Sequence, residues 1–297
     1  MGKTIYTIRK RELNDTTRAS IKGDFVKLSN GYTYYELKGD KDAKTIVLVH
    51  GNAAPSFTWD YNVQPLVDRG FRVLRYDIYG HGYSDRPKLE TYNKSLYDQQ
   101  LIELLEKLNI KESVYLVGTS QGGSICAYFT AKHPELVEKI AFLSPLFDKF
   151  EGEDKVKIMK SKKGEELMNQ MGDEMLLDPS NVFYSNDKKE ELSKKLKNQL
   201  MYKGKKRAIL ANIRGDGLDD ATIYYEKVKN QNIPMLLTWG EYDRSISKES
   251  MDRLRKLIPN MKFKLIRNAS HLVHYEFPDK INPIIIDFLT KDNTNNM

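Results

Sequence analysis

Cysteine is almost absent from this chain of 297 residues, which contains only Cys126. A single cysteine cannot form a disulfide within the chain, and we expect this one to be buried in a helix. Apolar runs are also short, since none approaches the roughly 20 residues needed to span a bilayer. Residues 1–6 lack the apolar core of a secretory signal and do not fit the myristoylation pattern. We therefore expect a cytoplasmic protein with no integral membrane segment.

Signals for nucleic-acid or metal binding are missing from the sequence as well. The formal net charge of +7 would suit a nucleic acid or a membrane surface. Lysines are interspersed with acids, however, and no arginine-rich block, zinc pattern or RNP-like motif accompanies them. Neither His50 nor His81 has a partner at metal-ligand spacing. We interpret the charge as solvated surface and expect no nucleic-acid partner, no metal and no organic cofactor.

What the chain does contain is an alternation of β-rich and helical segments. Asn30-Gly31 between β-rich runs predicts a hairpin. Apolar runs predict strands at 24–28, 32–37, 45–49, 72–77, 114–117, 140–143, 234–240 and 263–266. Periodic segments predict helices at 59–69, 95–108, 124–131, from 248, and at 279–289. This rhythm is typical of an α/β fold with a mostly parallel sheet covered by helices on both faces.

The rhythm stops between residues 147 and 229, where no buried strand is visible. Leucines and methionines recur there at helical spacing: Met168, Met171, Met175, Leu192, Leu196 and Leu200. We interpret 147–229 as a helical insertion, with residues 1–146 and 230–297 forming one core. The methionines would suit an acyl chain, but for most of them packing within the insertion itself is the favoured interpretation.

A G-x-S-x-G pattern marks the centre of the core. Gly118-Thr119-Ser120-Gln121-Gly122 follows a predicted strand and precedes a predicted helix, which is the setting that a nucleophile elbow requires. Glycines on both sides give clearance to a strained turn. The Ser120 hydroxyl would then stand at a helix N-terminus, where a developing anion is stabilised. The pattern alone would equally fit a glycine-rich turn with an incidental serine.

A nucleophilic serine needs a histidine and an acid later in the chain. His271 directly follows a predicted strand and is favoured as the base, whereas His274 would lie on a helical turn and pack. Asp243 follows another strand and is the favoured acid, but Glu241 and Asp148 also follow strand ends. Since carboxyl ends of parallel strands share one edge of a sheet, these groups could converge.

Taken together, these segments resemble the α/β-hydrolase superfamily over nearly the whole chain outside the insertion. The matching motifs, in chain order, are His50-Gly51 with Trp59, Asp77-x-x-Gly80-x-Gly82-x-Ser84, the elbow, and Trp239-Gly240-x-x-Asp243 followed by His271. The resemblance implies a Ser120–His271–Asp243 triad and an oxyanion hole formed by the backbone amides of Gln121 and of Asn52 or Ala53. It also implies that His50 and His81 shape loops, and that the insertion is a lid.

The resemblance further implies a serine hydrolase acting on carboxylic esters. Serine at position 120 disfavours epoxide opening and dehalogenation, for which relatives carry aspartate at the elbow. A small ester, a monoacylglycerol or a lysophospholipid is the expected substrate. One alternative is a carbon–carbon bond hydrolase of ring-cleavage products, which would need cationic groups near the lid or Arg214. Aminopeptidase-like or perhydrolase activity, or a non-catalytic receptor that keeps the fold, are further alternatives.

Overall fold

The computed structural model describes residues 10–52, 54–148, 153–170, 188–217 and 219–291. Within these residues the chain forms an eight-stranded sheet of order β1-β2-β4-β3-β5-β6-β7-β8. β1 and β2 form the expected antiparallel hairpin, β2 pairs antiparallel with β4, and the other pairs are parallel. The strands are β1 (Asp24–Leu28), β2 (Gly31–Lys38), β3 (Thr45–Val49), β4 (Arg72–Tyr76), β5 (Val114–Thr119), β6 (Val137–Leu143), β7 (Met235–Gly240) and β8 (Lys262–Ile266).

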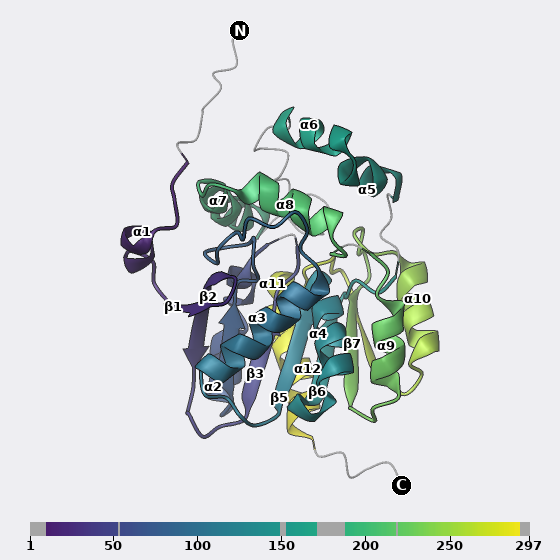
Figure 1. Cartoon of the computed structure of the whole chain (residues 1–297). Coiled ribbons are helices and arrows are strands. Elements are labelled where there is room, and N and C mark those ends of the chain that lie inside the picture. The colour runs from purple at the N-terminus through teal and green to yellow at the C-terminus, as the bar shows by residue number, and fades with distance from the viewer. Residues whose placement is uncertain (1–9, 53, 149–152, 171–187, 218, 292–297) are drawn as a thin grey trace.

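Helices cover both faces of this sheet (Figure 1). They are α1 (Asp15–Ala19), η1 (Ser56–Trp59), α2 (Val63–Asp68), α3 (Lys94–Lys107), α4 (Gln121–Lys132), η2 (Pro134–Leu136), α5 (Glu153–Lys160), α6 (Lys162–Gln170), α7 (Lys189–Leu200), α8 (Lys205–Arg214), α9 (Thr222–Lys229), α10 (Lys248–Leu257), α11 (Val273–Glu276) and α12 (Pro278–Thr290). Among the described helices, none is both long and apolar enough to cross a bilayer.

The core consists of two apolar layers, one on each side of the sheet. Side chains of β3 alternate between them, because successive residues of a strand point to opposite faces. Val47 and Val49 belong to the layer that includes residues of α3, α4, α9 and α10, whereas Ile46 and Leu48 belong to the layer that includes residues of α2, α11 and α12. All four side chains are buried, which explains why this segment is an unbroken β-branched and aliphatic run. The predicted α/β class and mostly parallel sheet are confirmed.

Four helices of the segment between β6 and β7 lie together beyond one end of the sheet (Figure 1). α5, α6 and α8 contact one another, and α7 packs on the core through Leu192, Leu196 and Leu200. α9 differs, because it packs along α4 and buries Tyr225 between Phe142 and Phe147. Met168 on α6 is buried, whereas Met171 and Met175 lie outside the described residues.

One local prediction was wrong, and one helix was not predicted. The helix expected from Trp59 is instead a 3-10 turn, η1, followed by α2 starting at Val63. Trp59 is fully buried and stacks on His274, so its place in the core determines the local backbone. Within residues 10–23, where no sequence pattern predicts an element, the structure has α1, whose N-terminus is capped by the side chain of Asn14. Cys126 is buried in α4 as predicted.

Candidate active site

Ser120 occupies a strained turn between β5 and α4. Its φ of 52° and ψ of −126° fall outside the regions that non-glycine residues favour. Its glycine neighbours are needed for close packing: a Cβ on Gly122 would lie 2.2 Å from the carbonyl oxygen of Val49, and one on Gly51 would lie 2.7 Å from Cβ of Ser120. The serine side chain is therefore presented at the carboxyl end of β5, at the first turn of α4.

His271 and Asp243 meet at the same edge of the sheet. His271 follows β8 and Asp243 follows β7, and Nδ1 of His271 lies 2.9 Å from Oδ2 and 3.1 Å from Oδ1 of Asp243. Both side chains are almost completely buried. Oδ1 of Asp243 also accepts backbone hydrogen bonds from Ser245 (2.9 Å) and Ile246 (3.1 Å). The carboxylate is thus fixed by the loop and fixes the imidazole in turn.

The two alternative acids have other partners. Asp148 accepts hydrogen bonds from Oγ of Ser250 and Nε of Arg253, so it anchors α10 to the end of β6. Glu241 is exposed and accepts a bond from the backbone N–H of Asn268 at 3.0 Å. Of these three acids, Asp243 is the one that the structure places on His271.

The proposed oxyanion donors lie on either side of Ser120. Gln121 is the first residue of α4, and the first N–H groups of a helix have no partner within the helix. Asn52 follows Gly51 at the end of β3, the strand next to β5. Ala53, the other candidate, lies outside the described residues. The side chains of Asn52 and Gln121 are joined by a third residue that the sequence did not indicate, Asn212 of α8.

Comparison with known proteins agrees with this architecture. A sequence family described as alpha/beta hydrolase fold matches residues 44–278, which is most of the chain. The chain belongs to the α/β-hydrolase family. Carboxylesterase YbfK of Bacillus subtilis is 24% identical, over 89% of this chain and 86% of the relative. A 2-hydroxy-6-oxononadienedioate/2-hydroxy-6-oxononatrienedioate hydrolase 1 of Pseudomonas putida is 26% identical, over 83% of this chain and 88% of the relative.

A solved structure shares the fold of this α/β hydrolase. The esterase of Exiguobacterium antarcticum superposes with a TM-score of 0.76 and 19% identity, covering 91% of this chain and 100% of that one. At such identity the superposition concerns the fold alone.

The two other histidines of the α/β-hydrolase motifs bind loop atoms. Nε2 of His50 accepts from the backbone N–H of Ile78 at 3.0 Å, and its Nδ1 donates to the carbonyl of Gly51 at 2.7 Å. Nε2 of His81 lies 3.2 Å from Oδ1 of Asn52. Burial lowers the pKa of His50, and lowers that of His81 well below its usual value, so both rings are neutral. These contacts agree with a loop-shaping role.

Asp77 is the centre of the same loop arrangement. Its Oδ1 accepts the backbone N–H of Ser56 and its Oδ2 accepts that of Tyr83, both at 2.8 Å. Gly82 has a φ of +51°, and a Cβ there would overlap the Asp77 carboxylate at 1.8 Å. The carboxylate therefore ties the loop after β4 to the loop after β3, which carries Asn52.

His274 lies close to His271 in the chain but has a different environment. It is fully buried, stacks on Trp59 at 4.0 Å between ring centroids, and its ring nitrogens have no partner among the described residues. Burial, together with the nearby His271, lowers its pKa to about 3. The ring is a neutral packing element, as its helical position suggested.

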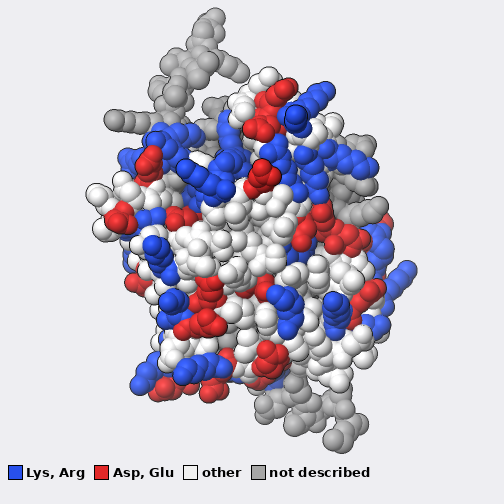
Figure 2. Space-filling view, in the orientation of Figure 1, with Lys and Arg blue, Asp and Glu red and all other residues white. Residues whose placement is uncertain are grey.

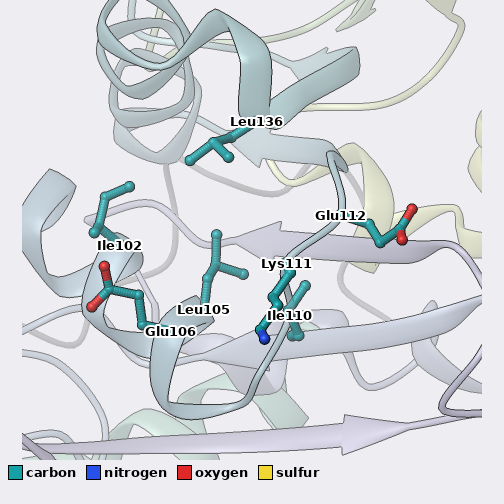
Figure 3. Close-up of a pocket in the computed structure, with 7 residues that line it drawn as sticks. All are labelled: Ile102, Leu105, Glu106, Ile110, Lys111, Glu112 and Leu136. Atoms are coloured by element: carbon teal, nitrogen blue, oxygen red, sulfur yellow. The ribbon is translucent and has the colours of Figure 1, made fainter.

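A surface pocket of about 410 Å³ lies away from this site (Figure 3). It is lined by Ile102, Leu105, Glu106, Ile110, Lys111, Glu112 and Leu136. These residues come from the end of α3, the connection that leads into β5, and η2. Ser120 stands at the opposite, carboxyl end of β5, so this pocket is not part of the candidate active site.

Proposed function

We propose that this α/β hydrolase cleaves carboxylic esters through an acyl-enzyme, with Ser120 as nucleophile, His271 as base and Asp243 as its orienting acid. The observation that carries the proposal is the contact of 2.9 Å between the buried side chains of Asp243 and His271, which follow two strands of the sheet that presents Ser120 on a strained elbow. A histidine that donates at Nδ1 leaves Nε2 as an acceptor for a hydroxyl proton.

Acylation follows from these roles. Oγ of Ser120 attacks the ester carbonyl carbon while its proton passes to Nε2 of His271, giving a tetrahedral oxyanion and an imidazolium. The backbone N–H groups of Gln121 and Asn52 donate to the oxyanion, where loss of one donor typically costs about 2.7–4 kcal/mol. As the intermediate collapses, the imidazolium protonates the alcohol, and the acyl group remains on Oγ.

Deacylation repeats the sequence with water. His271 takes a proton from a water molecule, the resulting hydroxide attacks the acyl carbonyl, and the carboxylic acid leaves as Oγ recovers its proton. Asp243 keeps its negative charge throughout and stabilises the imidazolium. No step in this sequence calls for a metal ion or an organic cofactor.

The segment 147–229 is proposed to act as a cap over this site. α7 supports the proposal because its leucines pack on Ala54, Leu272 and Tyr275. Ala54 belongs to the loop after β3, and Leu272 directly follows His271, so α7 packs with residues from two loops of the candidate site. α5–α8 are the part of the segment concerned, since α9 packs on α4.

The charged groups of the cap bear on the choice of substrate. Lys and Arg gather over this end of the molecule, with acids interspersed (Figure 2). Arg214, a candidate for holding a substrate carboxylate, forms an ion pair with Glu165 at 3.0 Å, and the two side chains are 26% and 59% exposed. An arginine whose charge is already paired with Glu165 favours a neutral ester over a dicarboxylate such as the one named for the Pseudomonas putida relative.

A fluorophosphonate probe and an ester series test the proposal. The probe should label the wild type and not Ser120→Ala. Turnover of p-nitrophenyl esters should be measurable and should depend on acyl length. Labelling without ester turnover would favour the carbon–carbon bond hydrolase, which a 2-hydroxy-6-oxo-dienoate substrate would identify. No labelling, or equal labelling of Ser120→Ala, would refute the serine mechanism and favour a non-catalytic receptor.

A further inference from the structure

Asn212 is a fully buried amide on α8, within the segment between β6 and β7. Its side chain makes four hydrogen bonds. Nδ2 donates to Oε1 of Gln121 (3.1 Å) and to Oδ1 of Asn52 (3.2 Å). Oδ1 accepts from Nε2 of Gln121 (2.8 Å) and from the hydroxyl of Tyr97 (2.8 Å). Both N–H donors and both acceptor lone pairs of the Asn212 amide are therefore used.

Two hydrogen-bond partners of Asn212, Gln121 and Asn52, belong to the segments around the candidate nucleophile. Gln121 follows Ser120 on the elbow, and Asn52 follows Gly51 in the loop after the neighbouring strand β3, where Gly51 lies against Ser120. Their backbone amides are the two proposed oxyanion donors. Asn212 joins their side chains directly, and it reaches them from the proposed cap rather than from the core.

The remaining contacts anchor this connection. Tyr97 of α3 is fully buried and holds Asn212 from the core side. On the other side, Nε2 of His81 lies 3.2 Å from the same Oδ1 of Asn52 that Asn212 binds. The result is a continuous hydrogen-bond network from α3 through α8 to the loop that follows β3, fully buried at Tyr97 and Asn212 and partly buried at Asn52.

We propose that Asn212 is a positioning residue that fixes the two oxyanion donors relative to each other and makes their alignment depend on the cap. The inference rests on the proposed function. Asn212 acts through Asn52 and Gln121, to which its side chain is hydrogen-bonded, and not by contact with the reacting atoms. Oxyanion donors must lie 2.7–3.1 Å from the developing charge, and a displacement of 1 Å can cost on the order of a hundredfold in rate.

The expected kinetic signature separates positioning from substrate binding. Misaligned donors weaken an interaction made in the transition state, so kcat and kcat/KM should fall together. For Asn212→Ala we expect both to fall by about 10- to 100-fold, with KM within about threefold of wild type. The rate of labelling by a fluorophosphonate should fall in parallel, because its phosphoryl oxygen uses the same donors.

Asn282→Ala is a matched control. Asn282 on α12 is also a buried amide, with Nδ2 donating to the carbonyl of Tyr61 (2.9 Å) and Oδ1 accepting from Asn62 (2.7 Å). Its truncation should lower the midpoint of thermal unfolding to a similar extent while leaving kcat within about twofold. Asn212→Ser and Asn212→Asp are measured as well, so that the inference can be judged if Asn212→Ala does not fold.

The outcomes separate the inference from the proposed function. If wild type hydrolyses esters and Ser120→Ala does not, the function stands, and Asn212 variants with unchanged kcat would overturn the inference alone. A rise in KM at constant kcat would also overturn it, because it would assign Asn212 to substrate binding. An equal loss of kcat in Asn282→Ala would show a general effect of instability and overturn it too. Failure of wild type to react with probe and ester would overturn both.

Discussion

Replacing Asp243 by asparagine should impair catalysis through the tautomer of His271. Oδ1 of Asp243 accepts two backbone N–H bonds, from Ser245 and Ile246. In Asp243→Asn the amide oxygen must occupy the position of Oδ1 to accept these two bonds. The amide NH2 group then occupies the position of Oδ2 and faces Nδ1 of His271. His271 then has to accept at Nδ1 and carry its proton on Nε2, where it cannot take the proton of Ser120.

The size of the effect can be worked from these contacts. Turning the amide round would lose two backbone hydrogen bonds, which costs about 2–3 kcal/mol, so roughly one molecule in a hundred would have the productive tautomer. Loss of the carboxylate charge removes a charge-assisted hydrogen bond to the imidazolium, worth a further 1.5–3 kcal/mol or so. Together these predict a fall in kcat of about 10³- to 10⁴-fold.

The assay is the turnover of a p-nitrophenyl ester near neutral pH, with thermal unfolding measured alongside. Asp148→Asn is the control, because Asp148 also follows a strand but binds Ser250 and Arg253 instead of His271. It should lower stability and leave kcat within about threefold. Retention of more than a tenth of wild-type kcat in Asp243→Asn, or a large loss confined to Asp148→Asn, would refute the assignment.

Three further predictions concern other buried groups. The pKa of His274 is about 3 in the folded chain and about 6.5 in the unfolded chain. Between these two pH values the imidazole is therefore protonated in the unfolded chain and neutral in the folded one. Stability is therefore lost as pH falls through that window, and chemical denaturation of His274→Phe should show a smaller loss. Gly51→Ala, with its Cβ against Ser120, should slow esterase turnover far more than Gly70→Ala, whose Cβ meets no atom within 4 Å. Burial raises the pKa of the Cys126 thiol, so iodoacetamide should alkylate it only in denaturant.

Regular elements of the core were predictable because their signals are local. The run at Thr45–Val49 can bury both faces only as an inner strand, and its predicted bounds match β3. The elbow was visible because the turn requires glycine at 118 and 122, where a Cβ would overlap the carbonyl oxygens of Gly122 and Val49. The contact between His271 and Asp243 followed from parallel strands that end at one edge, once each residue was placed after its strand.

Other features depend on distant contacts that no local pattern reveals. The turn at Ser56–Trp59 forms because Trp59 is buried against His274, which lies more than 200 residues later. Asn212 carries no sequence signal, since a lone asparagine on a helix is usually exposed and its role here comes from three partners in separate segments. Only the assembled fold shows that the amide is buried among them.

Helices α5–α8, which form the proposed cap, are inserted between β6 and β7 as one continuous stretch of chain. This makes the segment a natural unit for exchange between relatives, since substrate preference could be transplanted while the strands and the loops of the candidate active site are kept. The hydrogen bonds from Asn212 of α8 to Gln121 and Asn52 set a condition on such chimaeras. A grafted cap would have to bring its own partner for Gln121 and Asn52, and chimaeras without one should fold and bind substrate yet turn over slowly.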